Sequence, residues 1–196
     1  MLYPPFSQDI LDKGKKAQKL SQENLVVTVS RLDASKHLER IPQIAAQTAR
    51  DVHFAVVGRM YNEGPLSYLE ALTKKMGLSE RVKFYPNASA KQKTDLLRRA
   101  KLYLHTMEGE HFGISIVEAM AMGCVPIVHD SGGMREFVPA QYRYISLKGA
   151  AQMINREIAE WSADKAQEAK QIASQFSIHN FSMHFLALFN DYWGAR

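Results

Sequence analysis

The chain has 196 residues, enough for one well-buried domain and short for two full ones. Hydrophobic residues make up 46% and charged residues 23%, which is ordinary for a globular protein. The net charge of +5 comes from dispersed basic residues, and the sequence has neither an aromatic-and-basic stripe nor a zinc-ligand spacing, so we do not predict a nucleic-acid-binding protein. No apolar run is long enough to cross a bilayer, so we do not predict a membrane-spanning protein.

The predicted elements alternate between strands and helices. The first six residues hold two prolines and read as an extended linker, and a polar helix is expected over 7–21. Strands follow at 25–30, 53–57, 81–85, 101–105 and 125–129, with a candidate sixth at 142–147. Helices are expected at 37–49, 65–76, 91–100 and 115–122, then as one or two helices from 149 to 176, and finally at 180–193.

Strands that alternate with amphipathic helices predict an α/β fold: a Rossmann-like parallel sheet of about six strands with helices on both faces. Ligands of such sheets bind outside the carboxyl ends of the strands. The single cysteine, Cys124, lies in an apolar run that favours core packing, and it fits a reducing compartment such as the cytoplasm.

Two cations flank the first predicted strand–helix junction. Arg31 offers a planar fork of donors and Lys36 a point charge, and together they suit a diphosphate. Surface cations are the alternative interpretation. Gly58, at the end of the second strand, is expected on the same edge of the sheet and favours the functional one.

A second feature is the run from Glu108 to Gly133. Its Phe112-Gly113-Ile114 turn opens a helix, whose first amides form an anion site. Glu110 lies just before that turn, and Glu118 lies inside a helix that is otherwise apolar, where a carboxylate is costly without partners. Carboxylates only accept hydrogen bonds and therefore suit hydroxyl-rich ligands, so we predict a ligand that combines phosphate and sugar.

A further glycine pair, Gly132-Gly133, repeats the strand–glycine–helix arrangement and is a weak signal by itself. The histidines in the neighbouring loops show no metal-ligand spacing, so no metal is predicted. Among them, His111 is expected to touch the sugar and His129 to satisfy a local hydrogen bond.

Together these motifs resemble the C-terminal, donor-binding domain of retaining GT-B glycosyltransferases of the family-4 group. The signature is the Glu-x7-Glu element from Glu110 to Glu118, supported by the Arg31/Lys36 pair and by Ser131-Gly132-Gly133. The run from His111 to Gly133 is most similar to mannosyltransferases that extend lipid-linked oligosaccharides from GDP-mannose. His37, where many relatives have glycine, and Met134, where those mannosyltransferases often have proline, depart from the pattern.

The resemblance implies roles for these residues. Arg31 and Lys36 would neutralise the diphosphate, and Glu110 would bind the transferred hexose with the amides of Phe112 and Gly113. Glu118 would hold the ribose, and the base would pack against the stretch Phe84-Tyr85-Pro86-Asn87 at the third strand. The full set of predicted site residues is Arg31, Lys36, Gly58, Phe84, Tyr85, Glu110, His111, Phe112, Gly113, Ile114, Glu118, Gly132 and Gly133. No cofactor or metal is implied, because cations and helix amides already face the diphosphate.

The resemblance also implies partners. Residues 1–8 would be a remnant of the interdomain linker, 9–175 the nucleotide-sugar-binding domain, and 176–196 a helix that crosses back to an N-terminal Rossmann domain. Without that domain the chain would bind a nucleotide-sugar but transfer nothing to the glycan or lipid-linked acceptor. With a lipid-linked acceptor, the whole enzyme would work in the cytoplasm, with peripheral contact to the membrane face.

Three alternatives remain open. A transferase of glucose, galactose or N-acetylglucosamine from a UDP-sugar differs in the nucleotide that it prefers. An epimerase of the same architecture would hydrolyse the donor without an acceptor. A non-catalytic module that binds nucleotide-sugars is the third, although such a module would not need Arg31, Lys36, Glu110 and Glu118 together.

Overall fold

A six-stranded parallel sheet lies at the centre of the structure, a computed structural model that describes residues 2–16 and 23–193. The strand order is β3-β2-β1-β4-β5-β6, which confirms the predicted α/β fold with about six parallel strands. The strands are β1 (Glu23–Arg31), β2 (His53–Arg59), β3 (Val82–Pro86), β4 (Ala100–His105), β5 (Val125–His129) and β6 (Arg143–Tyr144).

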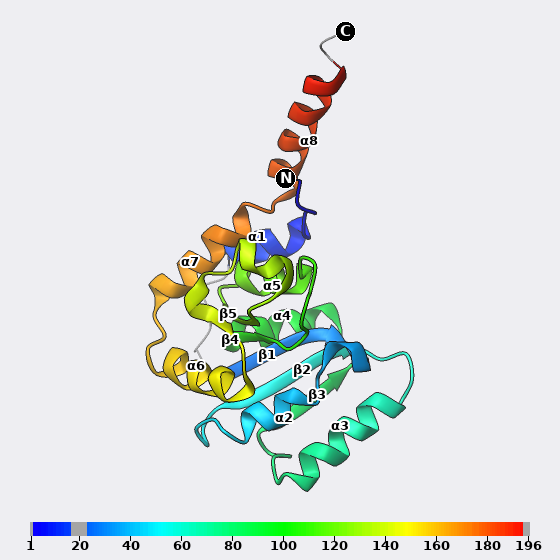
Figure 1. Ribbon diagram of the computed structural model, residues 1–196, viewed down its shortest axis with the longest axis vertical. Coiled ribbons are helices and arrows are strands. Elements are labelled where there is room, and N and C mark those ends of the chain that lie inside the picture. The colour runs from blue at the N-terminus through cyan, green and yellow to red at the C-terminus, as the bar shows by residue number, and fades with distance from the viewer. Residues whose placement is uncertain (1, 17–22, 194–196) are drawn as a thin grey trace.

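Helices cover both faces of the sheet (Figure 1). On one face lie α1 (Gln8–Lys16), α4 (Ala90–Arg99), α5 (Ile114–Ala121) and α7 (Ala163–Ser174). On the other lie α2 (Arg40–Ala45), α3 (Gly64–Lys75) and α6 (Leu147–Ala159). Three short 3-10 turns complete the connections: η1 (Ala34–Lys36), η2 (Gly132–Glu136) and η3 (Ala140–Tyr142). The first predicted helix is thus observed up to Lys16, and its predicted remainder lies outside the described residues.

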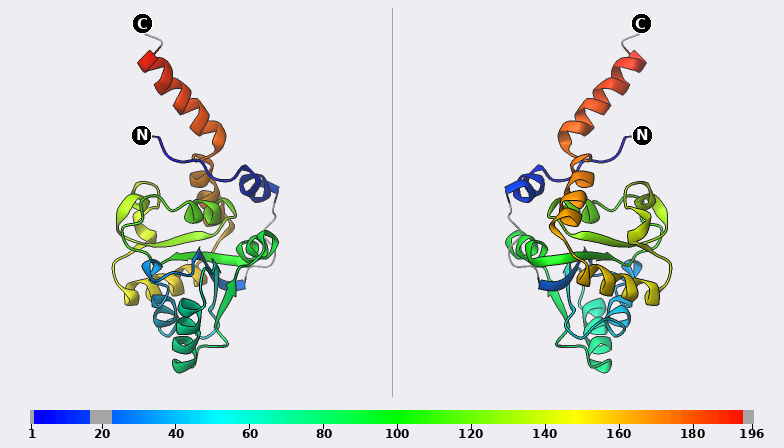
Figure 2. Two further views of the ribbon diagram at one scale, coloured as in Figure 1. Left: turned by 90° about the vertical axis from the view of Figure 1, so that its right-hand side faces the viewer. Right: turned by 90° about the vertical axis from the view of Figure 1, so that its left-hand side faces the viewer.

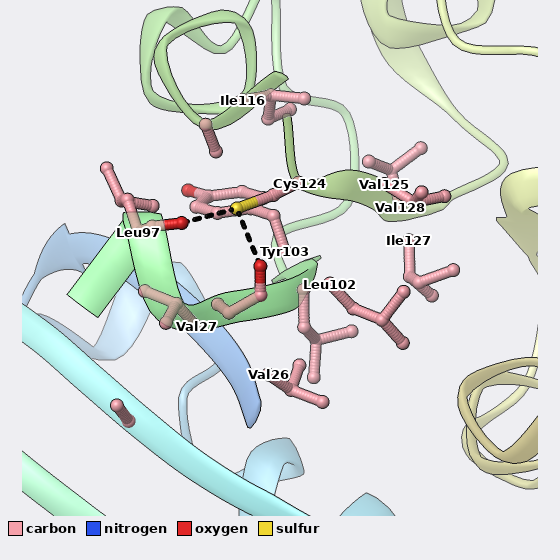
Figure 3. Packing of buried hydrophobic residues seen from close by; sticks show 14 of the residues in the cluster. Val26, Val27, Leu97, Leu102, Tyr103, Ile116, Cys124, Val125, Ile127 and Val128 are labelled. Carbon is pink, nitrogen blue, oxygen red and sulfur yellow. Dashed lines mark hydrogen bonds between the residues drawn. The ribbon is translucent and has the colours of Figure 1, made fainter. Parts of the chain in front are cut away.

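The core forms where the central strands meet α4 and α5. Val27 pairs in register with Tyr103 of β4, and both side chains are fully buried. The Tyr103 hydroxyl donates to the Val29 carbonyl (3.0 Å) and contacts Ser115 Oγ (2.8 Å), so the phenol ties β4 to β1 and α5. Cys124 is buried beside this ring, where its Sγ lies 3.2 Å from the Leu97 carbonyl oxygen, as Figure 3 shows. The expectation that Cys124 packs in the core is confirmed.

The order of the strands reverses between β1 and β4. The chain proceeds from β1 outward to β2 and β3, then returns through α4 to β4 on the opposite side of β1. The loops after β1 and β4 therefore turn to opposite faces and leave a crevice between them. This is the position at which the sequence places its cations and its first carboxylate.

Two elements differ from prediction. The helix expected over 37–49 is shorter than predicted and consists of α2 alone. It starts late because His37 adopts a left-handed conformation (φ 51°), and the amides of Arg40 and Ile41 then donate to carbonyls three residues back, those of His37 and Leu38. The sixth strand has only two residues, because Ser146 already caps α6 by accepting a hydrogen bond from the Gly149 amide (3.1 Å).

The start of the chain and the segment just before the last helix meet at one aromatic cluster. The Phe6 amide donates to the Phe176 carbonyl (3.3 Å), and the Phe176 ring packs against Tyr3, Phe112 and Phe137. From there α8 (Ile178–Trp193) projects away from the body of the molecule (Figures 1 and 2). No residue of α8 is buried: Phe181 is half-buried, and the other large apolar side chains are exposed, as predicted.

Candidate functional site

A cleft of about 920 Å³ opens at the carboxyl ends of β1, β2 and β4. Of the predicted site residues, those that line it are Arg31, Lys36, Gly58, Glu110, His111, Phe112, Gly113 and Ile114. Asn87, from the stretch expected to pack on the base, lines it too. Residues that the sequence interpretation did not assign to the site line it as well: Pro4, Val29, Ser30, Val57, Arg59, Ala88, Lys93, His105 and Ser115. The structure therefore brings the two predicted cations, the first carboxylate and the start of α5 together around one space.

The centre of the cleft is the Glu110 carboxylate. Its Oε2 lies 3.0 Å from the Lys36 ammonium and 3.5 Å from His105 Nε2, and its Oε1 accepts a hydrogen bond from the His111 amide (3.2 Å). The Glu110 side chain is only 17% exposed. Its contact with His105 contributes most to lowering the pKa of Glu110, to about 2, and the Lys36 ammonium adds to this against the opposing effect of burial. Glu110 is therefore an ionised acceptor at neutral pH.

Lys36 is held by the loop that follows β1. The Asp33 carboxylate caps η1 by accepting hydrogen bonds from the Ser35 hydroxyl (2.6 Å) and the Ser35 amide (2.8 Å). These two bonds lower the pKa of Asp33. The Thr106 hydroxyl, just after β4, donates to the Lys36 carbonyl (2.8 Å). His37 closes η1 in the left-handed conformation that glycine adopts most easily. The residue after Lys36 therefore adopts a turn that glycine would accommodate with less strain.

Arg31 ends β1 at the rim of the cleft. It is exposed and makes no ion pair with any residue that the structure describes, so its guanidinium is available to an anion. Arg31 and Lys36 border the same cleft, as the sequence predicts for a pair that shares one anionic ligand.

The start of α5 faces the same space. Gly113 is the N-cap residue in a left-handed conformation (φ 81°), and no side chain of the described residues caps the helix. The first amides of α5 therefore have no side-chain acceptor and can bind an anion in the cleft. Gly113 and Ile114 both line the cleft, as predicted.

Gly132 and Gly133 do not line the cleft, but their backbone packs against the loop that carries Glu110. The Gly133 amide donates to the Glu110 carbonyl (2.9 Å). A Cβ atom on Gly132 would lie 2.3 Å from that same carbonyl oxygen, and one on Gly133 would lie 1.8 Å from the His111 carbonyl oxygen. Both positions require glycine because the loop that carries Glu110 rests directly on their backbone.

Glu118 lies one helical turn into α5, and its side chain is 16% exposed. Its Oε2 lies 3.0 Å from the ammonium of Lys93 on α4, which is the partner that a buried carboxylate needs. Glu118 itself does not line the cleft, but Lys93 does. No sequence pattern indicates that Lys93 of α4 pairs with Glu118 of α5.

Phe84 and Tyr85 are not brought to this cleft. They line a separate hollow between β3 and α3, together with residues such as Thr73 and Lys74. The residues that follow them, Asn87 and Ala88, border the cleft instead. Asn87 adopts a left-handed conformation (φ 52°), and its side-chain oxygen accepts from the Met60 amide (3.0 Å). The turn signal in Pro86-Asn87 could have indicated that the chain reaches the sheet edge there.

Two further histidines, His129 and His105, lie near the cleft. His129 Nδ1 lies 2.8 Å from Ser131 Oγ, which agrees with the local hydrogen bond expected for it. His105 is the site residue with the weakest sequence signal, because a histidine at the end of a buried strand is equally compatible with core packing. Across residues 2–16 and 23–193, no cluster of three or more His, Cys, Asp or Glu side chains could hold a metal ion. Within the same described part, no helix combines the length and hydropathy needed to cross a membrane.

Comparison with known proteins identifies the family. The model described as glycosyl transferases group 1 matches residues 9–176. Over 211 residues the chain is 26% identical to "GDP-Man:Man(3)GlcNAc(2)-PP-Dol alpha-1,2-mannosyltransferase" of Dictyostelium discoideum, an alignment that covers 95% of this chain and 41% of that protein. This chain therefore spans less than half the length of that relative.

Solved structures agree on the fold. Sucrose-phosphate synthase from Thermosynechococcus elongatus superposes with a TM-score of 0.82 at 19% identity, covering 100% of this chain and 53% of that one. The Anabaena protein HepE in complex with UDP superposes with a TM-score of 0.76 at 25% identity, covering 94% and 53%. The sheet topology, the cleft at its switch point and the family match lead to one conclusion: the chain belongs to the glycosyl transferases group 1 family, as a C-terminal domain of the GT-B type.

Proposed function

We propose that this chain is the donor-binding part of a retaining glycosyltransferase that transfers mannose from GDP-mannose to a glycan or lipid-linked glycan. The observation that carries the proposal is the convergence of Arg31, Lys36, Glu110 and the amide end of α5 on one cleft. Cations and helix amides suit the diphosphate, and an ionised carboxylate suits the sugar hydroxyls. The mannosyl specificity rests on the similarity to the mannosyltransferase of Dictyostelium discoideum.

In this proposal the bond between the sugar anomeric carbon and the β-phosphate oxygen breaks as the anomeric carbon bonds an acceptor hydroxyl oxygen. Negative charge develops on the departing nucleoside diphosphate, which takes up the hydroxyl proton. Arg31 and Lys36 neutralise that charge, which lowers the barrier by electrostatic stabilisation. These two cations replace a divalent metal, so we expect donor binding to be unaffected by a chelator. Glu118, paired with Lys93 beside the cleft, holds the ribose.

The acceptor binds elsewhere. We propose that the exposed apolar face of α8 packs on a further Rossmann domain, and that this chain alone does not transfer sugar. The exposure of Phe185, Leu186 and Phe189, each about half accessible, supports this. In the complete enzyme, a lipid-linked acceptor would place the protein at the cytoplasmic face of a membrane.

A UDP-hexose donor is the second candidate, because the similar structure of HepE was solved with UDP. Calorimetric titration with GDP, UDP and ADP distinguishes the two. We expect GDP to bind, with and without a chelator, and its affinity to fall at least about tenfold when Arg31 and Lys36 are both replaced by alanine. The matched control is Lys83→Ala with Lys101→Ala, two lysines outside the cleft. Preference for UDP would change the donor but keep the transferase, and binding of no nucleotide would contradict the donor site.

A further inference from the structure

His105 is a buried polar residue at the wall of the cleft. It ends β4, is 4% exposed and lines the donor cleft. Among the described residues its Nε2 atom is buried without a well-formed hydrogen bond, and it lies 3.5 Å from Glu110 Oε2. An unpaired buried donor costs roughly 1–3 kcal/mol, whereas a small turn of either side chain would bring this pair to hydrogen-bonding distance. The pair is therefore poised to form a shorter bond.

Lys36 already donates a hydrogen bond to Glu110 Oε2. Its ammonium lies 3.0 Å from Glu110 Oε2 and 2.9 Å from Met107 Sδ. In the proposed function, however, Lys36 must also neutralise the donor diphosphate. A lysine side chain is long and flexible, so it can turn from one partner to another. When it does, a carboxylate that is 17% exposed loses its cation and needs another donor.

We propose that His105 is a positioning residue that holds Glu110 through Nε2–H while Lys36 turns to the donor diphosphate. The proposal rests on the proposed function, in which Lys36 binds the diphosphate and Glu110 binds the hexose. His105 thereby acts on the sugar through Glu110 and leaves Lys36 free for the leaving group. The bond requires the proton of His105 to be on Nε2.

Among the described residues, no cation other than Lys36 and His105 pairs with the Glu110 carboxylate. Its Oε2 contacts Lys36 of η1 and His105 of β4, and its Oε1 accepts from the His111 amide. Arg31 and the His111 side chain line the same cleft and form no ion pair with Glu110 in the described part of the chain. Arg40 lies nearby but binds Glu108 at 2.6 Å. His129 also faces Glu108, at 3.7 Å. When the Lys36 ammonium leaves Glu110, His105 is therefore the side chain placed to donate to that carboxylate.

The His105 side chain can be changed without removing the local backbone support. The Tyr144 hydroxyl of β6 donates to the His105 carbonyl oxygen (3.0 Å), a bond that does not involve the imidazole. His105→Phe keeps a ring of similar width but removes the donor. His105→Gln keeps an N–H donor near the position of Nε2. If the phenylalanine variant does not fold, His105→Leu supplies a smaller apolar side chain.

The first experiment needs no ligand. The chain is labelled with ¹³C at glutamate carboxyls, the Glu110 signal is assigned by its loss in Glu110→Gln, and its pKa is followed by NMR. We expect the pKa of Glu110 to rise by at least about 1 unit in His105→Phe or His105→Leu, and to return most of the way in His105→Gln. An unchanged pKa of Glu110 in the apolar variants would overturn the proposal.

The second experiment separates positioning from general damage. Calorimetry with GDP and with GDP-mannose should show GDP affinity within about twofold of wild type in His105→Phe, but GDP-mannose affinity at least about tenfold lower. Equal loss for both ligands would overturn the positioning role. If the wild-type chain binds neither ligand, the proposed function is contradicted, and the Glu110 titration still supports or overturns the contact with His105.

Discussion

Gly133 shows at the scale of one residue how the site is supported. Its amide binds the Glu110 carbonyl, and a Cβ atom there would lie 1.8 Å from the His111 carbonyl oxygen. We expect Gly133→Ala to lower the free energy of unfolding by about 1–3 kcal/mol, because the loop that carries Glu110 must shift. Urea denaturation measures this. The control is Gly64→Ala, where the nearest atom to a new Cβ is Asn62 Oδ1 at 3.6 Å, and equal effects of both substitutions would contradict the explanation.

Glu110 gives a prediction for pH. Its folded pKa of about 2 lies below its ordinary value of 4.5, so its ionised form stabilises the fold above pH 4.5 and this contribution is lost as the pH falls from 4.5 towards 2. We expect wild type to exceed Glu110→Gln in stability by on the order of 2 kcal/mol at pH 7, and the difference to shrink below pH 4.5. Urea denaturation at several pH values tests this. Glu80→Gln, at a side chain that is 93% exposed, should show no such trend.

Single residues also mark the limit of sequence-based prediction. Glu110, Lys36 and Gly113 stand in motifs whose spacing indicates their chemistry, and the structure brings them to one cleft. His105 and Lys93 stand in no such motif. A loop separates His105 from its partner Glu110, and the whole of β4 lies between Lys93 and its partner Glu118. Only tertiary packing brings each pair together.

At the scale of elements, periodicity located the strands and long helices well, because their buried faces repeat regularly along the chain. It failed where a local bond ended an element. Ser146 caps α6 and cuts β6 to two residues, and the left-handed His37 delays the start of α2. Phe84 and Tyr85 belong to β3 as predicted, but β3 is an edge strand beside α3, and its side chains do not reach the cleft.

The last helix gives a prediction at this scale. No side chain of α8 is buried, so a chain that ends at Ser177 should keep its free energy of unfolding within about 0.5 kcal/mol. Phe176, by contrast, is 6% exposed within the aromatic cluster, and Phe176→Ala should cost about 3–5 kcal/mol. Urea denaturation of the two variants compares them. A large loss of stability on removal of α8 would show that the helix packs on the domain.

At the scale of the whole molecule, the alternation of strands and helices predicted the parallel sheet and the edge at which ligands bind. It did not predict the order of the strands. The crossover from β3 back past β1 to β4 depends on which faces the helices cover, and that is a property of the assembled layers. The switch point between β1 and β4, where the cleft lies, therefore became visible only in the structure.

The meeting of Phe6 with Phe176 has a consequence for engineering. These residues are far apart in sequence, yet one backbone hydrogen bond joins them, so the polypeptide enters and leaves the sheet domain at a single spot. Residues 6–176 therefore form a cassette with adjacent ends. Exchanging residues 6–176 between relatives would need two junctions that lie close together in space, and the path of the backbone would stay the same. Donor preference would then be exchanged as one unit.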